Sequence, residues 1–376
     1  MKKSTNKTKV FAAVIVIIVV AIATYIGTSK TRAYSSALKA IDNGNYLSSI
    51  SILENLSGYK EADILLDQSW YGAAKDYYDN RQYVEALSAI DKISNPVNVE
   101  GVDDLKNLCT YEYGKELMDS EKYDEAHKVF SSMADYEDSI SLDRLCLHMI
   151  DVQNDTEPPV ISGLEESVSV LCGTNFNVKD YLRKNITIND NVTESVSEYS
   201  VTCDDDLYDI GSGNVKTTRV KDLTFVISAE DEAKNEAKRE MVVSLKAIHV
   251  TKDDSHPTVY DGEYATIKVS SFKHGEFYGE KEYQFMFEVK NKMDKPLVVY
   301  LPSSTSINDY QVGAYYIVSS IAPGKTGLME SSISDSDIPD SIGDYNQIDS
   351  DVCLMEDGED RPFYSIPIVF DTNAIE

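Results

Sequence analysis

The sequence predicts a multi-domain protein, helical in its N-terminal part and built from β-strands after that. Residues 10–29 contain no charged side chain, residues 33–150 carry apolar side chains at steps of three and four, and residues 160–376 contain short β-branched runs between polar turns. These patterns are typical of a transmembrane helix, of packed helices and of β-sandwiches, respectively. The expected order is a transmembrane helix, a short helical repeat array and two antiparallel β-sandwiches.

The uncharged run is long enough to cross a membrane. Its most apolar part, Val10–Ile26, has 17 residues, and the full run to Ser29 makes a comfortable span at ~1.5 Å per residue. A cleaved signal peptide is the alternative, because Ala21-Ile22-Ala23 fits a small-residue cleavage site. That site lies inside the apolar run, so we favour an uncleaved signal anchor. The first cysteine is Cys109, which argues against a lipoprotein.

Basic residues predict the orientation of this anchor. Four lysines precede the run, at positions 2, 3, 7 and 9, while Lys30 and Arg32 follow it. An excess of basic residues on one side favours the cytoplasm for that side. We therefore expect a cytoplasmic tail at 1–9, a single-pass anchor at 10–29 and an extracellular body at the cell membrane.

The remainder of the chain is strongly acidic. The net charge is −29 over 376 residues, and residues 1–32 carry six basic and no acidic side chains, so residues 33–376 carry −35. Such a body is repelled by nucleic acid and by anionic polymers. The composition therefore excludes nucleic acid as a partner.

An internal repeat marks the helical part at 33–150. Three tyrosines each stand 12 residues before another, at spacings of 37 and 40 residues, and a polar turn precedes the second tyrosine of each pair. The pairs are Tyr34 and Tyr46, Tyr71 and Tyr83, and Tyr111 and Tyr123. Each unit fits a helical hairpin whose second helix begins at the tyrosine, and we expect the tyrosines to serve mainly in packing.

These turns resemble those of tetratricopeptide-like repeats. Residues 80–86 and 120–126 carry the turn-Tyr-x-x-Ala pattern, and Tyr136-Glu137-Asp138-Ser139 is similar to short-repeat variants of Gram-positive surface proteins. The full family pattern of Trp, Leu and Pro positions is absent. The resemblance implies stacked hairpins with a groove that holds peptides or protein segments.

A linker at 151–159, ending in Pro158-Pro159, precedes the first predicted sandwich at 160–247. Residues 155–161 and 229–237 resemble the entry and the penultimate turn of bacterial Ig-like surface domains, with Lys234 where glycine is usual. Predicted strands include residues 167–171, 199–202, 223–227 and 241–245. The resemblance implies a spacer or adhesive module.

The second predicted sandwich covers 258–376. Its expected strands include residues 264–269, 283–289, 297–301 and 364–370. Residues 287–298 and 321–325 resemble the small Ig-like sandwich that ends many Gram-positive exported proteins. That resemblance implies no particular activity.

No catalytic pattern stands out, so we predict no enzyme, no catalytic, cofactor-binding or metal residues, and no cofactor. The histidines form neither HExxH nor an i,i+4 pair, and nucleophile-elbow, Walker A and dinucleotide patterns are absent. The histidines are His127, His148, His249, His256 and His274.

Two acidic clusters were weighed as calcium sites, because calcium takes six to eight oxygen ligands. One is Asp204-Asp205-Asp206 with Asp209; the other lies in the acidic segment 331–360, at Asp335, Asp337, Asp340, Asp344, Asp349 and Asp351. Neither follows the EF-hand order. We expect the segment 331–360 to be a mobile solvated loop between strands.

The five cysteines leave their redox state open. Their number is odd and no CxxC occurs, which excludes a zinc knuckle or a thioredoxin-type pair. Cys172 with Cys203, or Cys109 with Cys146, can pair in an exported protein. Free buried thiols, including Cys353, are the equal alternative.

The sequence thus predicts a membrane-tethered extracytoplasmic scaffold, whose helical array binds a peptide or protein of the cell envelope. The alternative is an adhesion or structural surface protein, in which the sandwiches bind and the helical repeats form a stalk. The membrane itself is the other predicted partner, through residues 10–29.

Overall fold

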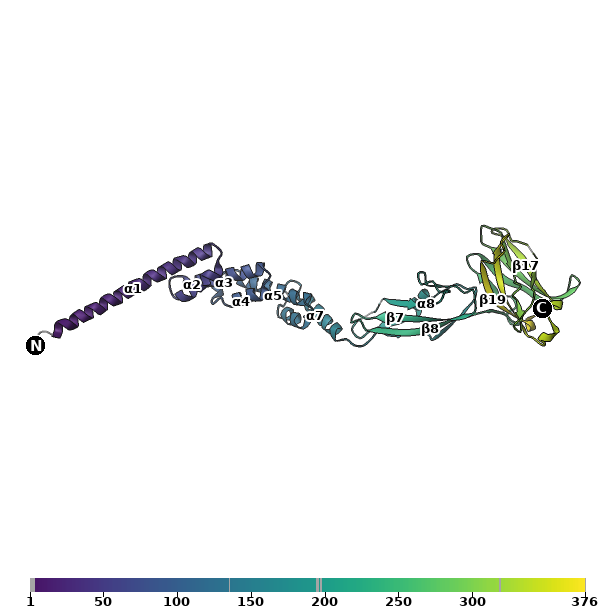
Figure 1. Ribbon diagram of the computed structural model, residues 1–376, viewed down its shortest axis with the longest axis horizontal. Coiled ribbons are helices and arrows are strands. Elements are labelled where there is room, and N and C mark those ends of the chain that lie inside the picture. Colours follow the sequence, from purple (N-terminus) through teal and green to yellow (C-terminus); the bar gives the residue numbers. More distant parts are fainter. Residues whose placement is uncertain (1–3, 135, 194–195, 197, 318, 376) are drawn as a thin grey trace. The chain divides into compact units, whose positions relative to one another are not determined.

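The chain divides into a helical unit and a β-rich unit. The computed structural model describes residues 4–134, 136–193, 196, 198–317 and 319–375. Its two compact units are Met1–Asp155 and Thr156–Glu376, and Figure 1 shows helices up to α7 in the first and mostly strands in the second. The predicted order of helices followed by a β-rich region is confirmed. Of the predicted tail 1–9, Met1 to Lys3 lie outside the described residues.

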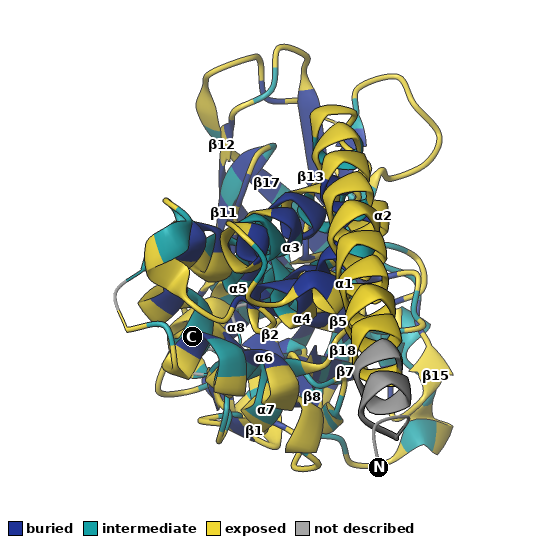
Figure 2. Cartoon of the chain, turned by 90° about the vertical axis from the view of Figure 1, so that its left-hand side faces the viewer, coloured by how far each residue is buried: buried dark blue, intermediate teal, exposed yellow. Residues whose placement is uncertain are grey.

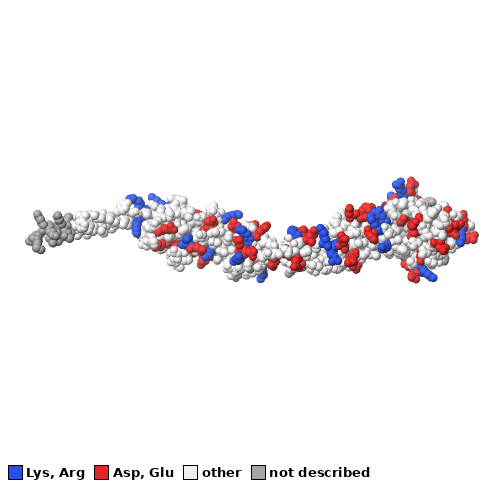
Figure 3. All heavy atoms as spheres, turned by 60° about the horizontal axis from the view of Figure 1, so that its bottom comes forward, with Lys and Arg blue, Asp and Glu red and all other residues white. Residues whose placement is uncertain are grey.

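The first helix carries the whole uncharged run. Helix α1 spans Ser4–Asp42, and its apolar side chains from Phe11 to Ile26 are exposed (Figure 2). This part of α1 is white in Figure 3, whereas charged side chains appear farther along the chain. The helix is long and apolar enough to cross a membrane, a property that signal sequences share. It continues past Ser29 without a break, and its C-terminal part packs on α2 as the first helix of the repeat unit.

The other helices of this unit follow one another in hairpins, and each packs on the next in sequence. Consecutive contacts of this kind are the rule in helical repeat arrays. The helices are α2 (Tyr46–Leu53), α3 (Ala62–Asp79), α4 (Tyr83–Ile90), α5 (Val102–Asp119), α6 (Tyr123–Ser131) and α7 (Ser139–Asn154).

One turn geometry recurs at the end of α1, α3 and α5. Gly44, Arg81 and Glu121 occupy the same place in these turns, with φ values of 71°, 58° and 58°. In each turn the next residue donates its N–H to a carbonyl five residues back, as Gln82 does to Tyr77 at 2.9 Å. This is the Schellman pattern, which satisfies the last carbonyls of a helix. The predicted second-helix tyrosines follow directly, as the first residues of α2, α4 and α6.

Small residues let the hairpins approach closely. A Cβ atom built on Gly72 would lie 2.5 Å from the ring of Tyr46, and one on Gly114 would lie 2.6 Å from the ring of Phe130. Alanines fill comparable places, since Ala74 and Ala86 are fully buried. At both glycines the backbone of one helix therefore contacts an aromatic ring of a neighbouring helix.

The β-rich unit contains two larger sheets, a four-stranded sheet and two short ladders. The four-stranded sheet has the order β2-β8-β7-β5, the larger ones β10-β11-β12-β17-β16 and β15-β14-β18-β19-β9, with β13 on β18. The ladders are β1-β4 and β3-β6. The strands are β1 (Val160–Ser162), β2 (Ser167–Leu171), β3 (Phe176–Asn177), β4 (Thr187–Asn189), β5 (Tyr199–Thr202), β6 (Asn214–Val215), β7 (Lys221–Glu230), β8 (Glu236–Lys246), β9 (Ile248–Val250), β10 (Thr258–Asp261), β11 (Ala265–Phe277), β12 (Glu280–Asn291), β13 (Leu297–Tyr300), β14 (Ser306–Ile307), β15 (Tyr310–Gln311), β16 (Tyr315–Tyr316), β17 (Thr326–Ser334), β18 (Gln347–Glu356) and β19 (Tyr364–Asp371).

Buried apolar side chains of this unit form one continuous cluster, from Ile161 to Phe370. Alternation directs them inward: Leu223, Phe225 and Ile227 on β7 are buried, and the residues between them are not. The expectation of purely antiparallel sheets is wrong at two places, since β2 pairs with β8 and β9 pairs with β19 in parallel. Each of these parallel pairs brings together strands far apart in the chain.

Two segments differ from the sequence expectation. Residues 347–356, predicted as part of a mobile acidic loop, form β18, which pairs with β13, β14 and β19. Its buried side chains, including Ile348, Val352 and Leu354, hold it in the core and outweigh its acids. Residues 178–185 form a helix, α8, between the strands, with the side chain of Asn177 accepting the N–H of Asp180 at its start.

Replacing Gly114 by alanine tests the close packing of α5 on α6. Gly→Ala inside a helix ordinarily stabilises a protein by roughly 0.5–1 kcal/mol. Here the new methyl group would meet Phe130, so we expect Gly114→Ala to destabilise the helical unit by about 1–3 kcal/mol in thermal or denaturant unfolding. Gly27→Ala, in open space on α1, is the control; a stabilised Gly114→Ala protein would contradict the packing described here.

Candidate functional site

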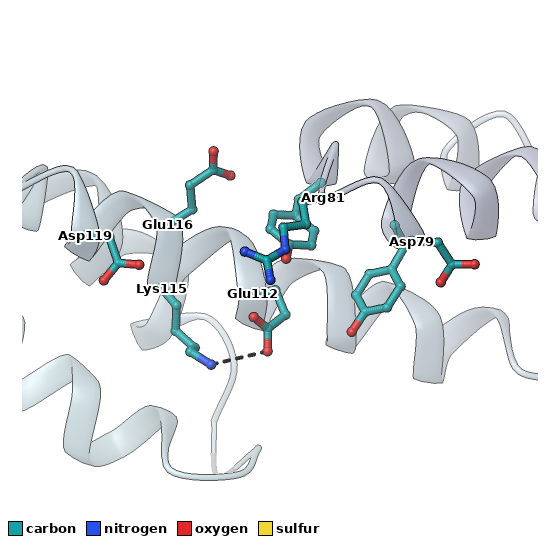
Figure 4. A pocket seen from close by; sticks show the side chains of 8 residues that line it. Asp79, Arg81, Glu112, Lys115, Glu116 and Asp119 are labelled. Atoms are coloured by element: carbon teal, nitrogen blue, oxygen red, sulfur yellow. Dashed lines mark hydrogen bonds and ion pairs between the residues drawn. The ribbon is translucent and has the colours of Figure 1, made fainter.

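The helical unit has an open pocket of about 640 Å³ beside α5 (Figure 4). The end of α3, the α3–α4 turn and the first residue of α4 form one side, and α5 forms the other. The α5 residues stand at i, i+3, i+4 and i+7, so they share one face of that helix. The lining residues are Tyr78, Asp79, Arg81, Tyr83, Glu112, Lys115, Glu116 and Asp119.

Acidic side chains outnumber basic ones in this pocket. Four carboxylates face two cations, and Lys115 Nζ lies 3.3 Å from a carboxylate oxygen of Glu112. Both side chains of that pair are partly exposed, so the pair itself adds little stability. The excess of negative charge favours a ligand with Lys or Arg side chains.

Two tyrosines give the pocket an apolar wall. The ring centroids of Tyr78 and Tyr83 are 5.8 Å apart, and both side chains are half-buried. Burial, assisted by the negative charge of Glu112, raises the pKa of Tyr78, so the phenol is neutral at physiological pH. A neutral phenol offers a hydrogen-bonding hydroxyl and an aromatic face for a cationic side chain.

The repeat tyrosines predicted from the sequence differ in their surroundings: some pack against other rings and one lines the pocket. Tyr34 is buried and meets Tyr59 edge-on at 5.9 Å, and 77 residues later Tyr111 meets Tyr136 edge-on at 5.8 Å. Tyr83, in contrast, lines the pocket. The pocket acids on α5 were not predicted from the sequence, although their spacing of i, i+4 and i+7 is a signal that could have found them.

The first acidic cluster weighed as a calcium site makes its contacts within the protein. Asp205 pairs with Lys221, Asp206 with Arg219, and Asp209 accepts the Ser212 hydroxyl at 2.7 Å. The second cluster is dispersed over the 3₁₀ turn Asp335–Asp337, the next turn at Asp340–Ile342, the connection that contains Asp344 and strand β18. Among the described residues, neither cluster forms a group of three acids close enough to share an ion.

The β-rich unit brings together a pair of acids that belong to neither of these two clusters. Carboxylate oxygens of Asp190 and Asp231 lie within 4.8 Å of each other. Asp231 is 4% exposed and accepts both the backbone N–H and the side-chain amide of Asn235, while Asp190 Oδ1 is buried without a hydrogen-bond partner. Burial opposes ionisation of Asp190, but N–H groups of Thr193 and Val192 lower its pKa. Such carboxylate oxygens can take part in holding a cation. Of the two acids, Asp231 lies in the segment 229–237 that resembles the Ig-like turn.

Two histidines and the cysteines make contacts within the fold. His127 lies 2.7 Å from Asp143 of α7, and His274 lies 2.8 Å from Asp335 and stacks on Tyr283. All five cysteines are free thiols, so neither weighed disulfide is formed. Burial raises the pKa of Cys109 and of Cys172 to about 11, which keeps these thiols protonated and unreactive at neutral pH.

Comparisons with known proteins add no family. No family model matches the sequence, and no curated protein matches it. A crystal structure of a protein of unknown function from Porphyromonas gingivalis W83 is 14% identical over 57% of this chain and all of its own, with a TM-score of 0.19. The protocadherin gammaB7 EC3-6 cis-dimer structure is 12% identical over 56% of this chain and 46% of its own, with a TM-score of 0.18. At such TM-scores neither likeness supports a conclusion about fold or function.

The Tyr111 phenol provides a pH test of the last hairpin. Its hydroxyl donates to Asp138 at 2.6 Å; this bond, with burial, raises the Tyr111 pKa from 10.0 to about 12. Because the pKa of Tyr111 is higher in the folded protein, its neutral phenol stabilises the fold fully below pH 10, and this stabilisation is lost as the pH rises through about 12. We expect Tyr111→Phe to lower the unfolding free energy by about 0.5–1 kcal/mol at pH 7 to 9, and the difference to vanish towards pH 12.

The matched control is Tyr34→Phe, at the equivalent position of the first hairpin. There the neighbouring charge is the Lys60 ammonium, 4.8 Å from the ring centroid. Phenylalanine keeps that contact, so the stability difference from wild type should not vanish between pH 9 and 12, where that of Tyr111→Phe does. A Tyr111→Phe difference that grew above pH 10 would contradict the assignment.

Proposed function

We propose that this protein is a single-pass, membrane-tethered scaffold of the cell envelope that holds a basic peptide or protein segment on its helical unit. The observation that carries the proposal is the acidic, tyrosine-walled pocket beside α5. That pocket belongs to the same unit as the exposed apolar helix α1. The recurring Schellman turns support a tetratricopeptide-like interpretation of this array, in which grooves between hairpins hold extended segments.

The proposal places the N-terminus in the cytoplasm and both units outside. It is supported by the four lysines before the uncharged run, against Lys30 and Arg32 after it. In it the β-rich unit consists of Ig-like modules that act as spacer and second interaction surface. The function is non-enzymatic: the histidine and cysteine side chains discussed above are engaged in packing and internal hydrogen bonds.

The rival proposal is an adhesion protein in which the β-rich unit binds and the helical unit is a stalk. The exposed edge of the four-stranded sheet at β5 supports it, because an edge strand can pair with an added strand. Binding of envelope or host surfaces that is unaffected by changes in the helical pocket would favour this rival.

Reversing charges in the pocket separates the two proposals. In full-length protein, Glu112→Lys combined with Glu116→Lys should weaken binding to Lys- and Arg-rich peptides on an array of envelope-protein segments at least tenfold. Opposite charges attract such ligands across the pocket, and the double change reverses that attraction. Glu85→Lys, at an exposed site on α4 outside the lining residues, is the control and should bind as wild type does. Peptide binding that ignores ligand charge, or is equal in all three proteins, would overturn the pocket proposal.

A cysteine placed at Val97 tests the orientation. Val97 is 91% exposed, whereas the native thiols are buried or half-buried. A membrane-impermeant maleimide added to intact cells should therefore label Val97→Cys far more than wild type. Labelling only after the cells are broken would place the helical unit in the cytoplasm.

A further inference from the structure

The turn between α2 and α3 returns to α1 close to the end of the uncharged run. Thr31 Oγ1 lies 2.9 Å from the hydroxyl of Tyr59, and the rings of Tyr34 and Tyr59 are 5.9 Å apart. Thr31 stands two residues beyond Ser29, or ~3 Å along the helix axis. If α1 spans a bilayer, the Tyr59 hydroxyl lies in the headgroup layer, which is roughly 5–8 Å deep on each side.

Basic side chains gather at this level. Lys60 Nζ lies 4.8 Å from the ring centroid of Tyr34 and 5.5 Å from that of Tyr59, and Lys30 Nζ lies 6.0 Å from that of Tyr59. Lys30, Lys60 and Arg32 are exposed. Glu61 is the acid of the turn itself, while Asp63 accepts the N–H of Gly58 at 3.0 Å. Lys30 and Lys60 therefore lie beside the Tyr59 ring at the exit of α1, and Arg32 follows Lys30 by two residues on the same helix.

From its tyrosine onward, the turn before the last helix matches the turn before α3 but carries the opposite charge. Tyr136 follows Tyr59 by 77 residues and makes the same edge-on contact, with Tyr111, at 5.8 Å. Lys60 and Glu137 follow these tyrosines, with φ values of 53° and 48°. Both backbones need the left-handed conformation, and the fold thus accommodates either charge there. Packing within the fold therefore does not explain why the first turn has Lys60 where the last has Glu137, so we look for the reason in what lies outside the first turn.

We propose that Tyr59, Lys60, Lys30 and Arg32 form a membrane-proximal patch that binds anionic phospholipid headgroups of the leaflet from which α1 emerges. The inference rests on the proposed membrane anchor. Aromatic rings with a polar tip favour the interface, and lysine and arginine are attracted to anionic headgroups. The patch would hold the first hairpin on the bilayer surface and so fix where the array begins.

The test uses full-length protein with Trp70→Phe, which removes the one tryptophan of the chain. Tyr59→Trp and Tyr136→Trp are then compared in vesicles of phosphatidylcholine and phosphatidylglycerol that carry a quencher at the headgroup level. Emission from position 59 should fall at least twofold, whereas emission from position 136 should not change. Lys60→Glu, which copies the distal turn, should reduce the quenching at position 59, as should omission of phosphatidylglycerol.

The outcomes are distinguishable. A protein that does not float with vesicles defeats the anchor and with it this inference. A protein that floats but shows equal emission from positions 59 and 136 overturns the patch and leaves the anchor standing. If circular dichroism shows that Tyr59→Trp does not fold, nitroxide labels on Lys60→Cys and on Glu137→Cys are compared instead. The label at position 60 should be shielded from a water-soluble relaxation agent. Equal accessibility of the two labels would overturn the proposal.

Discussion

The helical unit depends on the residue that ends the first helix of each hairpin in the left-handed conformation. Gly44, Arg81 and Glu121 turn the chain there, and the hydrogen bonds around them close the helix end. The next helix then begins at a tyrosine and returns along its partner. The absence of a side chain at Gly114 lets Phe130 pack directly on the backbone of that partner. Without the turn, the apolar faces of neighbouring helices would not meet.

Because the turn leaves its central side chain in solvent, the repeat can vary charge without changing its fold. Arg81 faces the pocket with its surrounding acids, whereas Glu121 takes the same place in a later turn. In the separate turns between hairpins, Lys60 and Glu137 place opposite charges at left-handed positions. The charge at these exposed turn positions can therefore differ from one repeat to the next while the helices pack in the same way. Both proposals, a basic ligand beside α5 and phospholipid beside α1, follow from this separation of fold and charge.

The β-rich unit is organised by a different constraint, a single apolar core shared by strands distant in sequence. The parallel pair β2–β8 joins strands about 70 residues apart in the chain, and the parallel pair β9–β19 joins strands about 120 residues apart. Strand β18 shows the strength of this constraint, since its acids lie on partly solvated positions while Val352 and Leu354 are buried. Acids at alternate positions can be tolerated in a strand whose other face is buried.

Local patterns were enough to predict the uncharged helix, the hairpin repeat with its tyrosines, and strands such as Ser167–Leu171, because each follows from local periodicity and turn chemistry. The acidic runs could be listed from the sequence, but their pairing with Arg219 and Lys221 could not. Tertiary packing makes β18 a core strand, forms the parallel pairs and brings Asp190 to Asp231. It also set α5 against the α3–α4 turn to make the pocket. These features join residues far apart in the chain, and their energies come from packing and charge contacts that no local pattern encodes.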